Sequence, residues 1–210
     1  MQTTQIFLTR HGETQWNVER RMQGHSDSPL TTMGIAQANA LANYLKGYPF
    51  SALYSSDLSR AYQTAQAIAA TTSLEILTDL RLRERNLGIF QGLTTQELIE
   101  KFPQALQNYQ NNSDFVVPSG ESTRQFFNRC VVCMNEIARQ HLGGKVLIVA
   151  HGGVLNQFFR YVLNIPLESP RKFSIFNTSL NVFSYQNENW ILDSWGNLEH
   201  LRSLNALDEL

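Results

Sequence analysis

The sequence predicts an α/β layer fold with a mostly parallel central sheet. Short apolar runs alternate with longer segments in which apolar residues recur at helical spacing. The stretch 145–153 (KVLIVAHGG) begins with apolar residues at successive positions, which suits a central parallel strand that is buried on both faces. Ligands of such sheets bind beyond the carboxyl ends of the strands, so we expect the functional residues there.

The first half of the chain contributes three strands and two helices to this alternation. Strands are predicted at 5–9 (QIFLT), 51–55 (SALYS) and 74–78 (LEILT). A helix is predicted over 29–46 with Thr31 as its N-cap, and a second over 56–69 with Ser55 or Ser56 as its N-cap. The residues expected to face the core are Ala38, Leu41, Ala42 and Leu45 in the first helix and Ala61, Ala65 and Ile68 in the second.

The segment 86–120 differs from its surroundings, because it is rich in Gln, Asn, Gly and Pro. Its composition predicts a short helix and long loops, which is typical of a lid over a binding site. We expect one domain over residues 1–210, with this segment as a lid-like insertion.

The second half continues with a long amphipathic helix over 121–141 and a strongly apolar helix over 154–164. In the first of these, Cys130 and Cys133 share an apolar face, so their CVVC spacing indicates core packing rather than a redox motif. Residues 180–195 predict a hairpin whose turn lies near Asn187–Asn189.

Composition excludes several classes of function. The formal net charge is −1, with 17 Lys and Arg against 18 Asp and Glu, which argues against nucleic-acid and membrane partners. No apolar run approaches the roughly 20 residues of a membrane helix, and the first residues lack a cationic leader. Two cysteines cannot form a disulfide framework, so we expect a soluble, cytoplasmic protein.

Residues that can bind anions or take part in catalysis follow the ends of two predicted strands. They are Arg10-His11-Gly12 and His151-Gly152-Gly153. Arg60 lies in the first turn of a predicted helix, and Glu84 lies in the charged stretch RLRER. Two histidines and a carboxylate could hold a metal ion, but the charges of Arg10 and Arg60 would oppose it. The alternative is a phosphate cradle of guanidinium and imidazole groups, in which one histidine attacks phosphorus.

With these residues the chain resembles the histidine phosphatase superfamily, also called phosphoglycerate mutase-like, over about its whole length. The blocks that carry the resemblance are LTRHGETQWN (8–17), MQGHSDSPLTTMG (22–34), YSSDLSRAYQTA (54–65), RLRERNLGIFQG (81–92) and VLIVAHGGVLN (146–156).

The resemblance implies a three-layer α/β/α sandwich and a transient phosphohistidine on His11. It implies Glu84 as the proton donor and needs neither a metal ion nor a cofactor. The positions that it implies for binding the phosphoryl group or lining its pocket are Arg10, Arg60, His151, Gly152, Asn17 and Gln23.

The family contains both mutases and phosphatases, and the segment after Glu84 favours a phosphatase. Mutases of this family typically carry a Tyr, a Lys and paired Arg residues there to hold a carboxylate. Here Leu87 stands at the Tyr position, and Lys101 is the only cation from 86 to 120. A cation could still come from outside this segment, from Arg20, Arg21, Arg85 or Arg171.

We therefore expect a metal-independent phosphomonoester hydrolase, of broad or small-metabolite specificity, that acts on a small-molecule phosphomonoester. One alternative is a cofactor-dependent phosphoglycerate mutase. A further alternative is a non-catalytic phosphate-binding protein, which the presence of both His11 and Glu84 disfavours.

Overall fold

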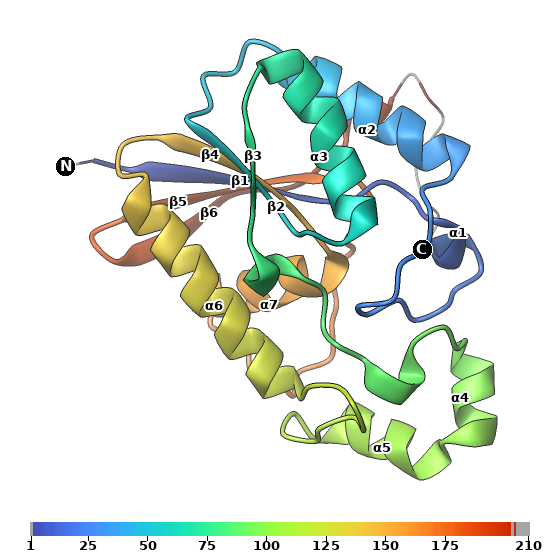
Figure 1. The fold of residues 1–210 in the computed structure, drawn as a ribbon. Helices are drawn as coiled ribbons and strands as arrows, with labels where there is room; N and C mark the ends of the chain where they lie inside the picture. Colours follow the sequence, from blue (N-terminus) through green and yellow to red (C-terminus); the bar gives the residue numbers. More distant parts are fainter. Residues whose placement is uncertain (1, 203, 205–210) are drawn as a thin grey trace.

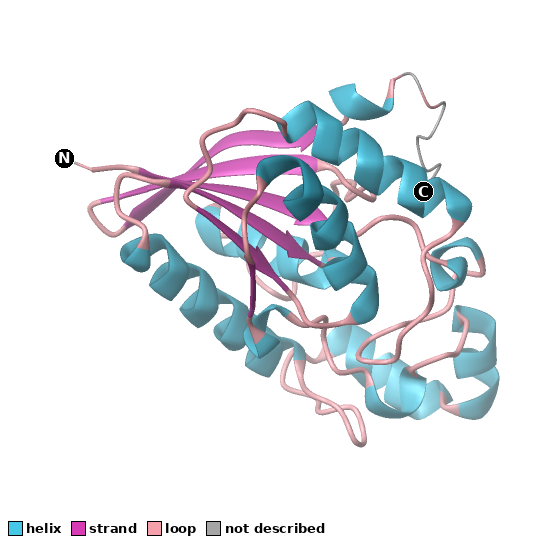
Figure 2. Ribbon diagram, turned by 45° about the horizontal axis from the view of Figure 1, so that its top comes forward, coloured by secondary structure: helices cyan, strands magenta, loops and turns pink. Residues whose placement is uncertain are grey.

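The computed structural model describes residues 2–202 and 204. Its centre is a six-stranded sheet in the order β3-β2-β4-β1-β5-β6, with helices on both faces (Figures 1 and 2). The strands are β1 (Thr4–Arg10), β2 (Ala52–Ser55), β3 (Ile76–Thr78), β4 (Lys145–Ala150), β5 (Leu180–Gln186) and β6 (Asn189–Asn197). The strands β1 to β4 run parallel to one another, β5 runs antiparallel to β1, and β6 runs antiparallel to β5, which confirms the predicted layered α/β fold.

The sheet separates two apolar cores. Side chains of α2 (Thr32–Leu45) and α3 (Ser59–Thr72) pack on one face, and those of α6 (Thr123–Gln140) and α7 (Gly152–Val162) pack on the other. Successive side chains of a strand point to opposite faces, so β1 and β4 each contribute to both cores. Every residue of β4 from Val146 to Ala150 is fully buried, which confirms its expected place as a central parallel strand.

Most predicted helical faces are buried as expected. The predicted core residues of α2 and α3 are all buried, and so is the cysteine-bearing face of α6. Thr31 caps α2 as predicted, because its hydroxyl oxygen accepts a hydrogen bond from the Gly34 backbone N–H at 2.9 Å.

The predicted N-cap of α3 is wrong. The helix begins at Ser59 after Leu58, which has no capping side chain, and the Ser59 backbone N–H donates to Asp27 Oδ2 at 3.0 Å instead. The hydroxyl of Ser55 instead donates to the Ser56 carbonyl oxygen, and the Ser56 hydroxyl lies 2.8 Å from His151 Nε2. The two serines therefore serve the strand end and the neighbouring histidine rather than the helix.

The segment 86–120 is more helical than its composition predicts. It contains α4 (Thr95–Lys101) and α5 (Pro103–Asn111), which lie together away from the sheet (Figure 1). Thr94 and Glu97 form a reciprocal capping box at the start of α4, and Pro103 opens α5. A separate small core holds the segment together through Leu87, Phe90, Leu98, Leu106 and Val117.

The remaining elements are short. They are α1 (Gln15–Val18) and the 3-10 helices Leu80–Leu82, Gly88–Phe90 and Glu199–Leu201. The predicted hairpin is confirmed as β5 and β6, with Asn187 and Glu188 at positive φ in its turn. In the described part of the chain, no helix combines the length and the apolar character that a membrane span requires.

Candidate active site

The two strand-end signatures meet because β1 and β4 are neighbours. Arg10 pairs with Ala150 in the parallel register, and the His11 backbone N–H donates to the Ala150 carbonyl oxygen at 3.0 Å. The rings of His11 and His151 consequently lie with their centroids 5.2 Å apart. This juxtaposition is the one expected from strand-end residues of a parallel sheet.

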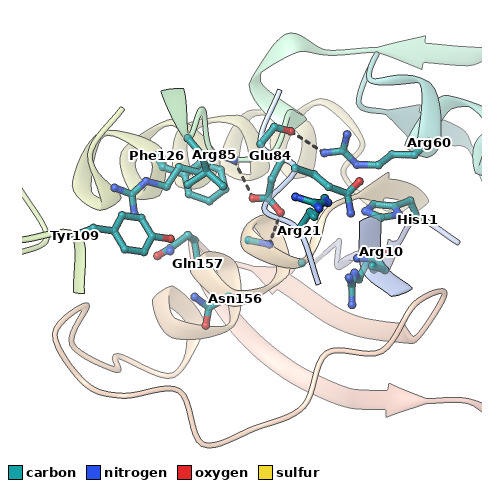
Figure 3. A pocket seen from close by; sticks show the side chains of 16 residues that line it. Arg10, His11, Arg21, Arg60, Glu84, Arg85, Tyr109, Phe126, Asn156 and Gln157 are labelled. Atoms are coloured by element: carbon teal, nitrogen blue, oxygen red, sulfur yellow. Dashed lines mark hydrogen bonds between the residues drawn. The ribbon is translucent and has the colours of Figure 1, made fainter. Parts of the chain in front are cut away.

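A cleft of about 290 Å³ opens beside these strand ends (Figure 3). The predicted site residues in its lining are Arg10, His11, Asn17, Gln23, Arg60, Glu84 and Gly152. His151 does not line the cleft and lies behind His11, fully buried. Further lining residues come from the segment 86–120 and from α6 and α7, namely Leu87, Tyr109, Phe126, Gly153, Asn156 and Gln157.

His11 is fixed in one tautomer by its own strand end. Its Nδ1 lies 2.7 Å from the Gly12 carbonyl oxygen, and a carbonyl only accepts, so Nδ1 carries the proton and Nε2 keeps its lone pair. The side chain is only 2% exposed, and Asn177 Nδ2 donates to its backbone oxygen at 2.8 Å. Burial, followed by the charges of Arg60 and Arg10, holds the pKa of His11 well below its usual range.

Arg60 is a buried cation held in place by a loop. Its Nη2 donates to the Gly24 carbonyl oxygen at 2.7 Å, and its Nη1 donates to Ser26 O and Asp27 Oδ1, each at 3.0 Å. The whole residue is 1% exposed, and among the described residues its Nε has no hydrogen-bond partner. A guanidinium group that is fixed in this way and borders the cleft favours an anion there.

Arg10 and His151 complete the polar surroundings of His11. Arg10 Nη1 donates to the Ile175 carbonyl oxygen at 2.9 Å, which holds its side chain against the loop before β5. Burial, with the charges of Arg60, His11 and Arg10, keeps the pKa of His151 well below its usual range. The site therefore presents two guanidinium groups and two neutral imidazoles, an arrangement that disfavours a divalent cation and favours a phosphoryl group.

Within residues 2–202 and 204, no three His, Cys, Asp or Glu side chains gather as ligands of a metal ion.

Glu84 points into the cleft from the loop before the segment 86–120. One carboxylate oxygen accepts the Gly153 backbone N–H at 2.9 Å, and the other accepts the Arg85 backbone N–H at 2.8 Å (Figure 3). A Cβ atom at residue 153 would lie 1.9 Å from Glu84 Oε1, so only glycine leaves room for the carboxyl group. The first turn of α7 thus positions this acid across the cleft from His11.

Two residues that the sequence did not single out for this role hold the backbone of Glu84. His25 Nε2–H donates to the Glu84 carbonyl oxygen at 2.9 Å, and Arg129 Nη2 donates to the same oxygen at 3.3 Å. Arg129 Nη1 also donates to the carbonyl oxygens of Arg81 and Arg83. The His25 ring is half-buried against the Glu84 backbone.

Asn17 and Gln23 line the cleft. Asn17 Oδ1 accepts the Thr14 backbone N–H at 3.1 Å as part of the capping box of α1, so helix capping also fixes this cleft residue. Gln23 is 9% exposed, and its Oε1 has no hydrogen-bond partner within the described chain.

Comparisons with known proteins agree with this geometry. A family model described as "Histidine phosphatase superfamily (branch 1)" matches residues 6–198. "Phosphoglycerate mutase-like protein 4" from Arabidopsis thaliana is 41% identical over 97% of this chain and 89% of its own length. The solved structure of Bacillus stearothermophilus YhfR superposes with a TM-score of 0.88 at 33% identity, covering 95% of this chain and 100% of that one. A mycobacterial glucosyl-3-phosphoglycerate phosphatase superposes with a TM-score of 0.80 at 31% identity, covering 92% and 99%.

Proposed function

Because this chain belongs to the histidine phosphatase superfamily (branch 1), we propose that it is a phosphomonoester hydrolase that works through a phosphohistidine on His11. The observation that carries the proposal is the state of His11. Its Nδ1–H donates to the Gly12 carbonyl oxygen, two guanidinium groups border the same cleft, and burial lowers its pKa, which favours the neutral ring. A neutral imidazole with a fixed lone pair on Nε2 is what attack on phosphorus requires.

In the first step the phosphoryl oxygens lie against Arg10 and Arg60, which neutralise their charge as the loose transition state forms, while the buried His151 lies beside His11. The Nε2 lone pair of His11 forms the new P–N bond while the P–O bond to the alcohol breaks. Glu84, protonated at this stage, donates its proton to the departing oxygen, so that a neutral alcohol leaves.

In the second step water attacks the phosphohistidine. The Glu84 carboxylate accepts a proton from this water as the new P–O bond forms. The P–N bond breaks, its electron pair returns to Nε2, and inorganic phosphate leaves. The cycle restores a neutral His11 and a protonated Glu84, and no step calls for a metal ion or a cofactor.

The surroundings of the leaving group favour a hydrolase over a mutase. Leu87 presents an apolar side chain to the cleft, and the exposed Lys101 does not reach its lining. Arg21 does line the cleft, but its Nη1 donates to Gly92 O and to Glu97, and its Nε donates to Glu19. A guanidinium group engaged with two carboxylates is poorly placed to hold the carboxylate of a phosphoglycerate.

Two other candidates follow from the comparisons and from the site. The name of the Arabidopsis relative favours a cofactor-dependent phosphoglycerate mutase as the second candidate. A non-catalytic phosphate-binding protein would not need an acid positioned opposite a neutral histidine, so we rank it third. We further propose that the enzyme has broad or small-metabolite specificity. We also propose a cytoplasmic location, since Cys130 and Cys133 are buried free thiols.

Incubation with 3-phosphoglycerate in the presence of a chelator separates the first two candidates. We expect release of inorganic phosphate with little 2-phosphoglycerate, because Arg21 is engaged with two carboxylates and Arg85 leaves only one guanidinium nitrogen for a ligand. Phosphate and 2-phosphoglycerate can be quantified in the same quenched samples. Isomerisation faster than phosphate release would make the mutase correct, and activity that returns only with a divalent ion would refute the metal-free mechanism.

A further inference from the structure

A second cavity of about 330 Å³ adjoins the cleft, and the two share Arg85, Tyr109, Asn156 and Gln157 in their lining. These four residues lie on the side of Glu84 that faces away from His11 and Arg60 (Figure 3). The leaving oxygen departs roughly in line with the attacking nitrogen, on the far side of phosphorus. If the proposed hydrolase mechanism holds, on which this inference rests, the alcohol part of the ester therefore extends past Glu84 into this second cavity.

The second cavity is lined mainly by uncharged polar side chains. Beyond the shared residues its polar lining consists of Gln110, Asn111, Asn112, Ser113, Thr123 and Glu168. Amide and hydroxyl groups both donate and accept hydrogen bonds, as the hydroxyl groups of a sugar do. In this lining, as far as the structure describes it, Arg85 is the only cation, and Glu168 is a carboxylate on the exposed side.

Arg85 offers a ligand one nitrogen. The residue is 6% exposed, its Nε donates to Glu121 O at 3.1 Å, and its Nη1 donates to Thr123 Oγ1 at 2.6 Å. Its guanidinium carbon lies 4.5 Å from the ring centroid of Tyr109. Nη2 is buried and has no hydrogen-bond partner among the described residues, so it is a donor held ready where the two cavities join.

Gln157 supplies the matching acceptor. The residue is 5% exposed, and its Oε1 is buried without a hydrogen-bond partner in the described part of the chain. It projects from α7 next to Tyr109 (Figure 3). A ligand hydroxyl can accept from a guanidinium nitrogen and donate to an amide oxygen, so it would satisfy both buried groups.

We propose that the second cavity is a subsite for an uncharged, hydroxyl-rich leaving group, that of a sugar or polyol phosphate, whose hydroxyls Arg85 and Gln157 bind. A carboxylate fits this subsite poorly. The bidentate pairing that favours carboxylates uses two guanidinium nitrogens, and two of the three in Arg85 are already engaged. The Glu168 carboxylate on the exposed side of the cavity would also repel a second anionic group.

Two matched pairs of substrates test the proposal through kcat/KM. Glucose 6-phosphate and cyclohexylmethyl phosphate have rings of similar size, and only the first carries hydroxyls. Sorbitol 6-phosphate and 6-phosphogluconate differ at the end of the chain far from the phosphate, where the first carries a hydroxymethyl group and the second a carboxylate. We expect the wild-type enzyme to prefer the first member of each pair by about tenfold or more, since a buried polar site rejects a ligand that leaves it unpaired. A ratio of kcat/KM values near one in either pair, or a ratio that favours the second member, would overturn the proposal.

Two variants test whether Gln157 causes the preference for the hydroxylated substrate. Gln157→Leu should lower the ratio of glucose 6-phosphate to cyclohexylmethyl phosphate by about tenfold, because it removes the acceptor while keeping the size of the side chain. Gln104→Leu is the matched control, since Gln104 lies on the exposed side of α5 and lines neither cavity. An unchanged ratio in Gln157→Leu would overturn the assignment of this residue. The wild-type ratios still decide the proposal if that variant fails to fold.

Calorimetric binding to His11→Ala separates this proposal from the proposed function. That variant cannot form a phosphohistidine, so intact esters remain available for binding. Tighter binding of glucose 6-phosphate than cyclohexylmethyl phosphate, and of sorbitol 6-phosphate than 6-phosphogluconate, supports the subsite, and equal affinities refute it. Hydrolysis of nitrophenyl phosphate by the wild type tests the proposed function by itself, because this substrate carries no hydroxyls for the subsite to bind.

Discussion

At the scale of single residues, Glu84 owes its position to main-chain donors. Its two carboxylate oxygens accept backbone N–H groups from Arg85 and Gly153, while His25 and Arg129 hold its carbonyl oxygen. The carboxyl group therefore has a fixed location between the phosphoryl pocket and the leaving-group side of the cleft (Figure 3). A group fixed at this point can protonate a departing oxygen without reorganisation of the site.

We predict that Glu84→Gln slows phosphohistidine formation much more for alkyl phosphates than for nitrophenyl phosphate. An alkoxide is strongly basic and needs the proton, whereas a nitrophenolate leaves without it. A gap of about 10²-fold is reasonable for one general acid. Single-turnover kinetics is the required measurement, because Glu84 also assists water in the second step.

Equal slowing of both substrates would show that Glu84 is not the acid. Glu13 and Glu19 would then be the next carboxylates to test. Neither lines the cleft, and Glu13 Oε1 already accepts the Thr31 hydroxyl at 2.6 Å, so the structure makes both weaker candidates.

At the scale of elements, the junction between β4 and α7 connects the histidine to the acid. The strand ends at Ala150, His151 is the N-cap residue, and the helix begins at Gly152. The glycine at 153 lets Glu84 and Phe126 approach the first turn, since an added Cβ would lie 1.9 Å and 2.8 Å from their nearest atoms. One turn of helix thus sets the separation between the phosphoryl pocket and the proton donor.

We predict that Gly153→Ala reproduces the substrate dependence of Glu84→Gln, with the larger loss for alkyl phosphates, because the methyl group displaces the acid. Gly152→Ala is the contrasting variant. Its Cβ would stand 3.5 Å from Arg10 Nε, an ordinary contact on the phosphate side, so any loss should be equal for the two classes of substrate. Single-turnover rates for both variants decide this. A loss in Gly153→Ala that does not depend on the leaving group would contradict the positioning role.

The sequence was most informative for elements with local signals. The apolar periodicity of α2 and the hydroxyl of Thr31 identify that helix and its start, and the structure confirms both. Only one short helix was expected where α4 and α5 lie, because their Gln and Asn residues hide a sparse apolar face that packs within the segment 86–120. The contacts of Arg129 and Ser56 join residues far apart in the chain, so no local pattern could predict them.

Within the site, too, local motifs were predictable and contacts between distant parts of the chain were not. Arg10, His11 and Gly152 were named from motifs that follow strand ends, because parallel strands bring those ends together. Arg60, Glu84, Asn17 and Gln23 lie outside those motifs, and the family resemblance supplied their roles. Their orientation was not predictable, since it depends on Asn177, His25 and the loop around Arg60. Motifs thus identified the chemistry, and tertiary contacts determine its geometry.

At the scale of the whole molecule, the five histidines share one electrostatic feature. The pKa of each is lowered from its ordinary value, mainly by burial. His11 and His151 show the strongest effect, and the pKa of His200 falls to about 4. The unfolded chain therefore binds more protons than the folded protein below about pH 6.5, the ordinary pKa of a histidine.

We predict that the free energy of unfolding decreases as the pH falls from 7.5 to 5.5. The stability that neutral burial of the histidines provides is present above their ordinary pKa and is lost as the pH falls toward their folded values. Each fully buried histidine contributes a slope of at most about 1.4 kcal/mol per pH unit. Urea unfolding at several pH values measures this, and stability that stays constant or rises toward pH 5.5 would contradict the assignment of neutral histidines.

The formation of a phosphohistidine on His11 is the central claim, and rapid quenching tests it most directly. Wild-type protein mixed with a radiolabelled phosphomonoester should yield a phosphoprotein that is labile to acid and stable to base. His11→Ala should yield none and should lose several orders of magnitude in activity, while His141→Gln, at the far end of α6, should retain both. A His11→Ala enzyme that keeps about a tenth of the wild-type activity, or that still carries the acid-labile label, would contradict the account.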